Sequence, residues 1–185
     1  MKFIKFLLIL FISINTSIKA DSKEIIIDEL NKGGKIIFIR HGYAPGSGDP
    51  SNFDIKDCAS QRNLNITGKK QSLEIGNFFK ENSISIENVY SSEWCRCKDT
   101  ALIAFNNYKT KKFLNSFFSL KFAKNKNHQI QDLKKFIKNL DGKLNVVFVT
   151  HYVVISEILD YAPSSGEIVV ADKNFKVIDT IAIPY

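Results

Sequence analysis

The chain has 185 residues, of which 44% are hydrophobic and 12% aromatic, a composition typical of an ordinary globular protein. Its 9 glycines and 4 prolines exclude a collagen-like chain or a flexible linker, and no apolar stretch reaches the roughly 18 to 20 residues of a transmembrane helix. The formal charge of +7 arises from 26 Lys and Arg against 19 Asp and Glu. These values predict one moderately basic domain.

The first 20 residues have the anatomy of a secretory signal peptide. Lys2 and Lys5 precede an apolar stretch over residues 6–14, and the segment ends in the small residue Ala20. An uncleaved anchor or a buried first strand is the alternative, but a small residue at this position suits a cleavage site better. We therefore expect cleavage after Ala20, a mature domain over residues 21–185 and a periplasmic or secreted location.

The three cysteines, Cys58, Cys95 and Cys97, predict one disulfide and one free thiol in an exported chain. Cys95 and Cys97 are too close in sequence for a relaxed bridge, so Cys58 is expected to pair with one of them. A zinc site is a weaker alternative, because the usual ligand spacing is missing. A thiol-disulfide oxidoreductase is weaker still, because its motif needs two residues between the cysteines.

The N-terminal half of the chain alternates regular elements with one long loop. An amphipathic pattern predicts a helix over 21–31, and the apolar run at 35–39 predicts a strand buried on both faces. Residues 42–66 carry several glycines and prolines and predict a long loop, which in a compact domain usually has a function. A helix is expected from Thr67, as its N-cap, to Glu81.

The C-terminal half continues the alternation of strands and helices. We expect a strand at 88–90, a helix at 94–107 capped by residues 91–93, a helix at 129–140, a strand at 145–150, a helix at 153–161, and a hairpin of 167–170 with 177–183 turning at 172–174. This order predicts a three-layer α/β/α sandwich with a mainly parallel sheet. In such sheets, ligands bind beyond the carboxyl ends of the strands.

Several cationic side chains follow the ends of the predicted strands. Arg40 and His41 follow the first strand, Arg96 follows the second by a few residues, and His151 follows the third. The chain has only three arginines beside 23 lysines, which indicates that each arginine serves as a planar, bidentate donor. Clustered positive charge repels a metal ion but suits a phosphoryl group. The sequence therefore predicts an anion site without metal or cofactor.

Four segments in this order resemble the histidine phosphatase superfamily, which includes the cofactor-dependent phosphoglycerate mutases. They are Phe38-Ile39-Arg40-His41-Gly42, then Leu64-x-x-Thr67-Gly68-x-x-Gln71, then Tyr90-Ser91-Ser92 leading to Arg96 and Thr100-Ala101, and finally Val149-Thr150-His151. Asp49-Pro50, Asp57-Cys58, Gln61-Arg62-Asn63-Leu64, Trp94-Cys95-Arg96-Cys97 and Ser165-Gly166-Glu167 are similar to a small exported subgroup that acts on lipopolysaccharide core phosphates. The resemblance implies the phosphoglycerate mutase-like fold.

The resemblance also implies a mechanism in which His41 is the nucleophile and forms a phosphohistidine that water hydrolyses. His151, Arg40 and Arg96 would stabilise the transferring phosphoryl group, and nearby arginines would lower the pKa of the nucleophilic imidazole. Further substrate-binding residues implied by the motifs are Arg62, Gly42 and Asn63. The expected substrate is a phosphomonoester or a similar phosphoryl compound, on a small molecule or a glycan.

The general acid is the weakest element of this prediction, because no Asp or Glu occurs between Asp99 and Asp132. Glu93, which precedes Arg96 by three residues, is our first candidate, although a glutamate in the first turn of a helix also has a structural explanation. The remaining candidates are Asp57, Asp49 and Glu167. Without an acid, phosphoramidates, acyl phosphates and pyrophosphates would react more readily than alkyl phosphates. A phosphate-binding pseudoenzyme is therefore the alternative function.

Aromatic residues alternate with lysines between residues 111 and 126. This pattern favours a buried loop with a solvated lysine rim over a nucleic-acid surface, and export makes nucleic acid an unsuitable partner. The same lysines favour peripheral contact with an anionic membrane or envelope surface, or with a phosphorylated glycan. His128 is expected on the surface. The pattern does not indicate an oligomeric state.

Overall fold

The computed structural model describes residues 24–184. The expected signal peptide and its cleavage point therefore lie outside the described residues. Residues 24–31 are helical, in agreement with the helix expected over 21–31. Within the described part of the chain, no helix is long and apolar enough to cross a membrane.

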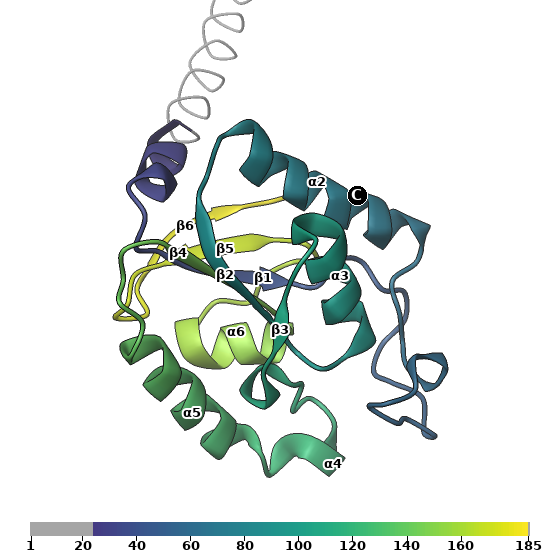
Figure 1. Ribbon diagram of the computed structural model, residues 1–185. Helices are drawn as coiled ribbons and strands as arrows, with labels where there is room; N and C mark the ends of the chain where they lie inside the picture. Colours follow the sequence, from purple (N-terminus) through teal and green to yellow (C-terminus); the bar gives the residue numbers. More distant parts are fainter. Residues whose placement is uncertain (1–23, 185) are drawn as a thin grey trace, which may run out of the picture.

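A six-stranded sheet forms the centre of the molecule, in the order β3-β2-β4-β1-β5-β6 (Figure 1). The strands are β1 (Ile36–Arg40), β2 (Ile86–Ser91), β3 (Lys109–Thr110), β4 (Asn145–Thr150), β5 (Ile168–Ala171) and β6 (Val177–Ile181). The first four are parallel to one another, whereas β5 pairs antiparallel with β1 and forms a hairpin with β6. The expected mainly parallel sheet and C-terminal hairpin are confirmed.

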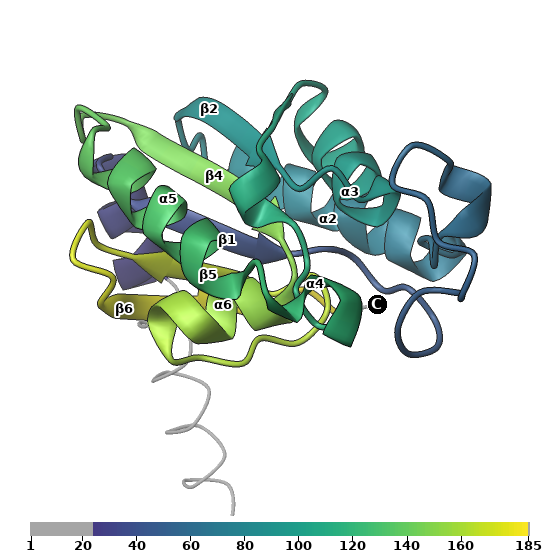
Figure 2. The same ribbon diagram turned by 90° about the horizontal axis from the view of Figure 1, so that it is seen from below.

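Helices cover both faces of this sheet, as Figure 2 shows from below. They are α2 (Ile66–Glu81) and α3 (Cys95–Phe105) on one face, α5 (Lys126–Lys138) and α6 (Tyr152–Leu159) on the other, and the short α4 (Leu120–Ala123) at the edge. Ile37 and Ile39 of β1 pack toward α2 and α3, while Phe38 packs toward α5 and α6. Alternate residues of one strand thus supply two cores, which explains the uninterrupted apolar runs.

Both predicted helix caps were wrong. Asn65, rather than Thr67, caps α2, and its side chain accepts a hydrogen bond from the Gly68 backbone N–H. The N-cap of α3 is Trp94, whose side chain makes no capping bond. The expected cap at 91–93 fails because Ser91 ends β2 and Ser92 bonds to a histidine instead. The two-residue β3 and four-residue α4 were not predicted, because such short elements leave little periodicity.

Candidate active site

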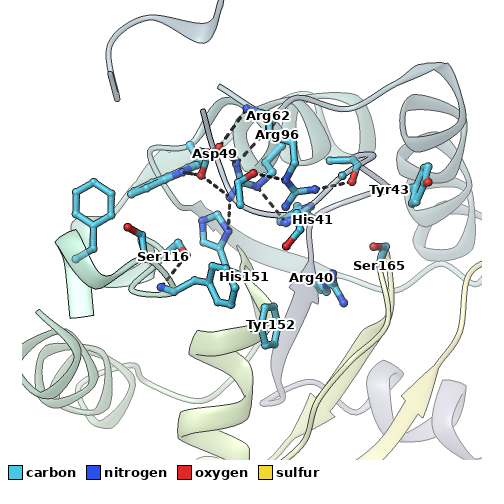
Figure 3. A pocket seen from close by; sticks show the side chains of 18 residues that line it. Arg40, His41, Tyr43, Asp49, Arg62, Arg96, Ser116, His151, Tyr152 and Ser165 are labelled. Atoms are coloured by element: carbon cyan, nitrogen blue, oxygen red, sulfur yellow. Dashed lines mark hydrogen bonds and ion pairs between the residues drawn. The ribbon is translucent and has the colours of Figure 1, made fainter. Parts of the chain in front are cut away.

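Beyond the carboxyl ends of the parallel strands lies a cavity of about 530 Å³, shown in Figure 3. Arg40 ends β1 and His41 follows it, while His151 directly follows β4. Arg96 lies in the first turn of α3, which follows β2. The two histidine rings are 5.4 Å apart between centroids, in an edge-on arrangement. The structure therefore brings together the four residues expected at this edge of the sheet.

His41 is held as a neutral imidazole with a defined tautomer. It is 2% exposed, and its Nδ1 lies 2.8 Å from the Gly42 carbonyl, which can only accept a hydrogen bond. Nδ1 therefore carries the proton, and Nε2 accepts a bond from Arg96 Nε at 3.2 Å. Burial, followed by the positive charge of Arg96, holds the pKa of His41 well below its ordinary value. Nε2 consequently carries the unprotonated lone pair that a nucleophile requires, and Arg96 must release this lone pair before it can attack.

His151 is also buried and neutral, but its ring is oriented differently. Its Nδ1 faces Arg96 Nη2 at 3.5 Å, and its Nε2 lies 3.0 Å from Ser92 Oγ. Because the guanidinium can only donate, Nδ1 accepts and Nε2 donates to the serine. Burial and then Arg96 lower the pKa of His151 well below its ordinary value. The end of β2 thus fixes the orientation of a side chain carried by β4.

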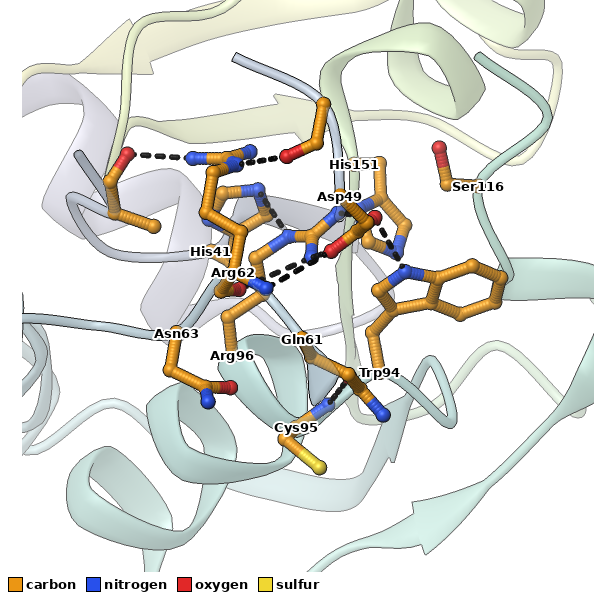
Figure 4. A network of polar contacts seen from close by, with 12 residues as sticks. His41, Asp49, Gln61, Arg62, Asn63, Trp94, Cys95, Arg96, Ser116 and His151 are labelled. Atoms are coloured by element: carbon orange, nitrogen blue, oxygen red, sulfur yellow. Dashed lines mark hydrogen bonds and ion pairs between the residues drawn. The ribbon is translucent and has the colours of Figure 1, made fainter. Parts of the chain in front are cut away.

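Arg96 connects the two histidines to the long loop, as the network in Figure 4 shows. Its guanidinium is nearly buried and forms a two-point pair with Asp49, at 2.7 Å from Nη1 to Oδ1 and 3.3 Å from Nη2 to Oδ2. Trp94 Nε1 also donates to the Asp49 carboxylate, at 3.0 Å. Asp49 therefore places a negative charge beside the Arg96 guanidinium, on the side where this guanidinium would bind a phosphoryl group.

Arg40 forms the opposite wall of the cavity. Its Nη1 donates to the Pro163 carbonyl at 2.8 Å, and its guanidinium lies 5.3 Å from the centre of the Tyr152 ring. The aromatic ring and the carbonyl restrict the plane of the guanidinium. Tyr152 directly follows His151, so the chain places an aromatic residue that stacks on Arg40 at this position.

Arg62 reaches the cavity from the loop that precedes α2. Its Nε donates to the Gly48 carbonyl at 2.9 Å, and Nη1 donates to the Ala44 carbonyl. A disulfide joins Cys58 to Cys95, with 5.7 Å between the Cα atoms, in agreement with the expected pairing of Cys58. The loop that carries Arg62 is thus covalently attached to the residue before Arg96.

Three expected site residues do not line the cavity. The Gly42 N–H donates to Thr100 Oγ1 at 2.9 Å, so this residue orients His41 instead of binding substrate. Asn63 donates to the Cys58 carbonyl at 2.6 Å. Glu93 lines a separate cavity of about 910 Å³ and accepts a bond from Asn115 Nδ2 at 2.7 Å. The motifs of the resembled superfamily suggested Gly42 and Asn63, and closeness in sequence to Arg96 suggested Glu93, but the course of the loop and of α3 directs these residues away from the cavity.

The other candidate acids are also engaged. Asp57 caps a 3-10 turn over Cys58–Ser60 through the Ala59 N–H, and Glu167 accepts bonds from Tyr161 OH and the Ser164 N–H. Asp49 is the sole carboxylate among the described residues that line the cavity. Partial burial is the largest single influence and opposes its ionisation, but the hydrogen bond and charge of Arg96, together with hydrogen bonds from Trp94 and the Arg62 N–H, outweigh it and lower the pKa of Asp49. Asp49 is consequently an ionised base rather than a proton donor.

The sequence did not by itself predict that several other residues line the cavity. Tyr43, Ser116, Phe118 and Ser165 come from three separate segments and complete the wall. Ser165 lies in the turn before β5, and its neighbour Gly166 bonds back to the Arg40 and His41 carbonyls. Only the Ser165-Gly166-Glu167 string among the resemblance motifs marked this region.

Cys97 lies against the histidine pair as a buried free thiol. Its Sγ is 3.5 Å from His151 Nε2, and burial raises its pKa to about 12. A thiol with this pKa carries almost no thiolate at neutral pH. The oxidoreductase alternative therefore lacks a reactive cysteine. Among residues 24–184, no group of three or more His, Cys, Asp or Glu side chains is arranged to hold a metal ion.

Solved structures resemble the chain over most of its length. A protein assigned as the phosphohistidine phosphatase SixA of Agrobacterium tumefaciens has a TM-score of 0.57 at 16% identity, covering 80% of this chain and 97% of that one. Phosphoglycerate mutase from Thermus thermophilus gives 0.55 at 14% identity over 80% and 98%. A protein histidine phosphatase SixA complexed with tungstate gives 0.53 at 15% identity over 80% and 96%. The chain has the fold of the histidine phosphatases.

This finding confirms the resemblance at the level of the fold. No family model and no curated protein matches the sequence. At such low identity, the four short motifs carry the correspondence; three of them lie at the carboxyl ends of β1, β2 and β4, and the fourth lies at the start of α2. The histidine phosphatase fold therefore agrees with the residues that line the cavity.

Proposed function

We propose that this protein is an exported phosphatase that hydrolyses a phosphomonoester or similar phosphoryl compound through a phosphohistidine on His41. The observation that carries the proposal is the fixed neutral tautomer of His41, which directs Nε2 into a cavity walled by Arg40, Arg62 and Arg96. A neutral imidazole beside three guanidiniums combines a nucleophile with a dianion clamp.

The reaction proceeds in two displacements. His41 Nε2 attacks phosphorus and forms an N–P bond while the bond to the leaving group breaks, and the leaving group departs with the electron pair. Water then attacks the phosphohistidine, which releases inorganic phosphate and restores the imidazole. Arg96, Arg40 and the His151 ring stabilise the charge on the transferring oxygens. Arg62 binds the phosphoryl group from the loop side.

We propose that neither a metal ion nor another cofactor takes part. Three guanidiniums around one cavity repel a cation, and they neutralise the phosphate charge that a metal would otherwise balance. Activity should therefore survive EDTA. Loss of turnover in EDTA, restored by zinc or magnesium, would refute this part of the proposal.

The ionised state of Asp49 favours substrates whose leaving group needs little protonation. Phosphoramidates, acyl phosphates and pyrophosphates meet this requirement, whereas an alkoxide does not. Two of the structural neighbours bear the name phosphohistidine phosphatase or protein histidine phosphatase, which supports a phosphoramidate substrate. We expect a much higher kcat for phosphohistidine or phosphoramidate than for an alkyl phosphate.

The location and the natural substrate are further parts of the proposal. The signal-peptide anatomy of residues 1–20 and the Cys58–Cys95 disulfide both support an oxidising compartment such as the periplasm. A glycan phosphate of the cell envelope, as in the subgroup acting on lipopolysaccharide core, is a second substrate class to assay. Purified protein from the periplasm, with its N-terminus read by mass spectrometry, tests the location.

A non-catalytic phosphate-binding module is the second candidate, and the Asp49–Arg96 pair favours it. A carboxylate that occupies the guanidinium leaves a weaker clamp for a transition state. Turnover of p-nitrophenyl phosphate separates the two functions, because its leaving group departs without an acid. Binding of inorganic phosphate without turnover would establish the binding module.

The decisive experiment is to trap labelled phosphate on the protein and to map the labelled histidine. We expect the label on His41, and we expect the His41→Ala variant to lose both label and turnover. In His151→Ala, labelling should persist at a lower rate, because that residue stabilises charge without forming the bond. Labelling that survives in His41→Ala but disappears in His151→Ala would reverse the assignment.

A further inference from the structure

The segment from the middle of α3 to the first turns of α5 has an unusual distribution of charge. Residues 100–131 contain no Asp or Glu but include six lysines. This segment passes along the catalytic cavity, since Ser116, Phe118, Ser119 and Phe122 all contribute to its wall. A purely basic stretch thus borders the entrance through which a phosphorylated substrate would arrive.

Large apolar side chains project from the same segment into solvent. Leu120, the first residue of α4, is 94% exposed, the highest value for a large hydrophobic side chain in the described part of the chain. Phe118 is 53% exposed and lies 5.9 Å, between ring centroids, from Tyr152 at the cavity. Burying a leucine side chain typically contributes about 1.5 to 3 kcal/mol, so a surface that covered Leu120 would gain free energy of this order.

Three exposed lysines lie near these apolar side chains: Lys121 follows Leu120 in α4, Lys124 ends that helix, and Lys112 lines the same adjoining cavity as both. Lys112, Lys121 and Lys124 line one adjoining cavity and form no ion pair with any described residue. We call these lysines together with Phe118 and Leu120 the basic apolar patch. Leu120 and Lys121 belong to α4, which lies at the edge of the molecule (Figure 1).

Three carboxylates lie near this patch, but none of them forms an ion pair with its lysines. Asp54, Glu93 and Asp132 line the same adjoining cavity as the three lysines. Asp132 pairs with His128 at 3.2 Å, and Glu93 accepts its bond from Asn115. The lysines therefore remain available for an external anion.

We propose that the basic apolar patch docks the protein onto an anionic lipid surface. Leu120 and Phe118 would enter the headgroup layer, and the lysines would contact lipid phosphates, as in other interfacial segments. A soluble polyanionic glycan would leave Leu120 exposed, and a second copy of the chain would bring like charges together. The lipid surface alone uses both the apolar and the basic side chains.

Docking in this way would place the catalytic cavity beside the membrane surface. Phe118 belongs both to the patch and to the cavity wall, so the entrance and the docked surface are adjacent. A substrate held at the bilayer would then be captured without leaving it. This consequence rests on the proposed function, whereas the docking itself does not.

Sedimentation with lipid vesicles tests the proposal. Protein purified from the periplasm should bind vesicles of phosphatidylglycerol and phosphatidylcholine, but not phosphatidylcholine alone, and salt should weaken binding. The double variant Lys121→Glu/Lys124→Glu should bind about 25-fold more weakly or worse, at roughly five-fold per lysine. Leu120→Asp should lose about ten-fold or more.

Matched controls come from α2, on the opposite face of the sheet. Leu73 is 50% exposed there, and Lys69 and Lys70 are exposed. Leu73→Asp and Lys69→Glu/Lys70→Glu should leave vesicle binding unchanged. Equal losses in these controls would overturn the proposal, because binding would then follow net charge or general hydrophobicity.

Other outcomes are equally informative. Absence of binding by the unaltered protein overturns the proposal, as does unchanged vesicle binding in Leu120→Asp. If dextran sulfate binding falls in the lysine variant while Leu120→Asp behaves normally, the patch binds an anionic glycan. A dimer that disappears in Leu120→Asp would indicate self-association instead.

Turnover of p-nitrophenyl phosphate without vesicles checks folding and tests the proposed function separately, because none of the altered residues lines the catalytic cavity.

Discussion

The two halves of the candidate active site are held by different means. His41 and His151 directly follow the buried strands β1 and β4, whose neighbouring residues Ile39 and Val149 are fully buried. Asp49 and Arg62 lie instead on the loop between β1 and α2. The Arg62 side chain donates to loop carbonyls, and the Asp49 carboxylate accepts from the Arg62 backbone N–H and from Arg96. The difference shows that the two histidines have rigid supports, whereas Asp49 and Arg62 depend on a loop.

A disulfide compensates for the weaker support of the loop. Cys58 and Cys95 are separated by 37 residues, and their bond attaches the loop to the first turn of α3. Gln61 reinforces the attachment, because its Oε1 accepts a bond from the Cys95 N–H at 2.9 Å. The loop half of the site thus owes its position to a covalent link and the strand half to packing.

The largest expected effect comes from Arg96, which contacts both halves. Arg96→Lys should lower kcat/KM by about 100- to 1000-fold, because one ammonium cannot reach His41, His151 and Asp49 in the plane of a guanidinium. Arg62→Lys, confined to the loop half, should cost about ten-fold. Steady-state turnover of p-nitrophenyl phosphate measures both variants. Equal losses would show that the two halves contribute alike.

Removal of the disulfide should affect the loop half selectively. In the chain-entropy model, opening a loop of this length lowers the free energy of unfolding by about 4 kcal/mol. Cys58→Ser should therefore unfold at lower urea concentration and show a raised KM, since Arg62 loses its anchor.

Cys97→Ala provides the matched control, because this buried thiol takes no part in the bridge. It should retain the KM of the unaltered protein. If reduction with dithiothreitol changes neither the urea midpoint nor the KM, the loop is held by its hydrogen bonds alone.

The strand half could be predicted from the sequence and the loop half only in part. Continuous apolar runs at 35–39 and 145–150 locate two buried strands, and parallel strands bring the residues after them to one edge. Asp49, by contrast, meets Arg96 across 47 residues, and no local pattern signals that contact. Glu93 was misassigned because its distance along the chain from Arg96 says little about the direction of its side chain.

The histidine pair predicts a pH dependence of stability. In the unfolded chain, each imidazole gains a proton as the pH falls through about 6.5. Burial and Arg96 lower the folded-state pKa of both His41 and His151, so both imidazoles stay neutral in the folded protein at this pH. The unfolded state then binds more protons. Stability should be fully present above pH 6.5 and fall by up to about 1.4 kcal/mol per pH unit for each histidine below it.

Urea denaturation between pH 5 and 7 measures this slope. His151→Gln should reduce it, because one of the two proton-binding differences is removed. His128→Gln should leave it unchanged, because that side chain is exposed at the start of α5. A slope that His151→Gln does not alter would mean that carboxylates dominate acid destabilisation.

The smallest expected effect concerns Asp49, the carboxylate that shares Arg96 with the substrate. Asp49→Asn keeps the shape of the side chain and an acceptor for Arg96 Nη1 but removes the charge. Stability should fall by about 1 kcal/mol, as for a weakened hydrogen bond to a charged group. Inorganic phosphate should inhibit about two- to five-fold more strongly, because the Asp49 charge no longer competes for the nearly buried guanidinium. The inhibition constant and the urea midpoint report these changes. A 100-fold loss of turnover on p-nitrophenyl phosphate would instead assign Asp49 a direct part in the reaction, and the loop half would then carry chemistry as well as recognition.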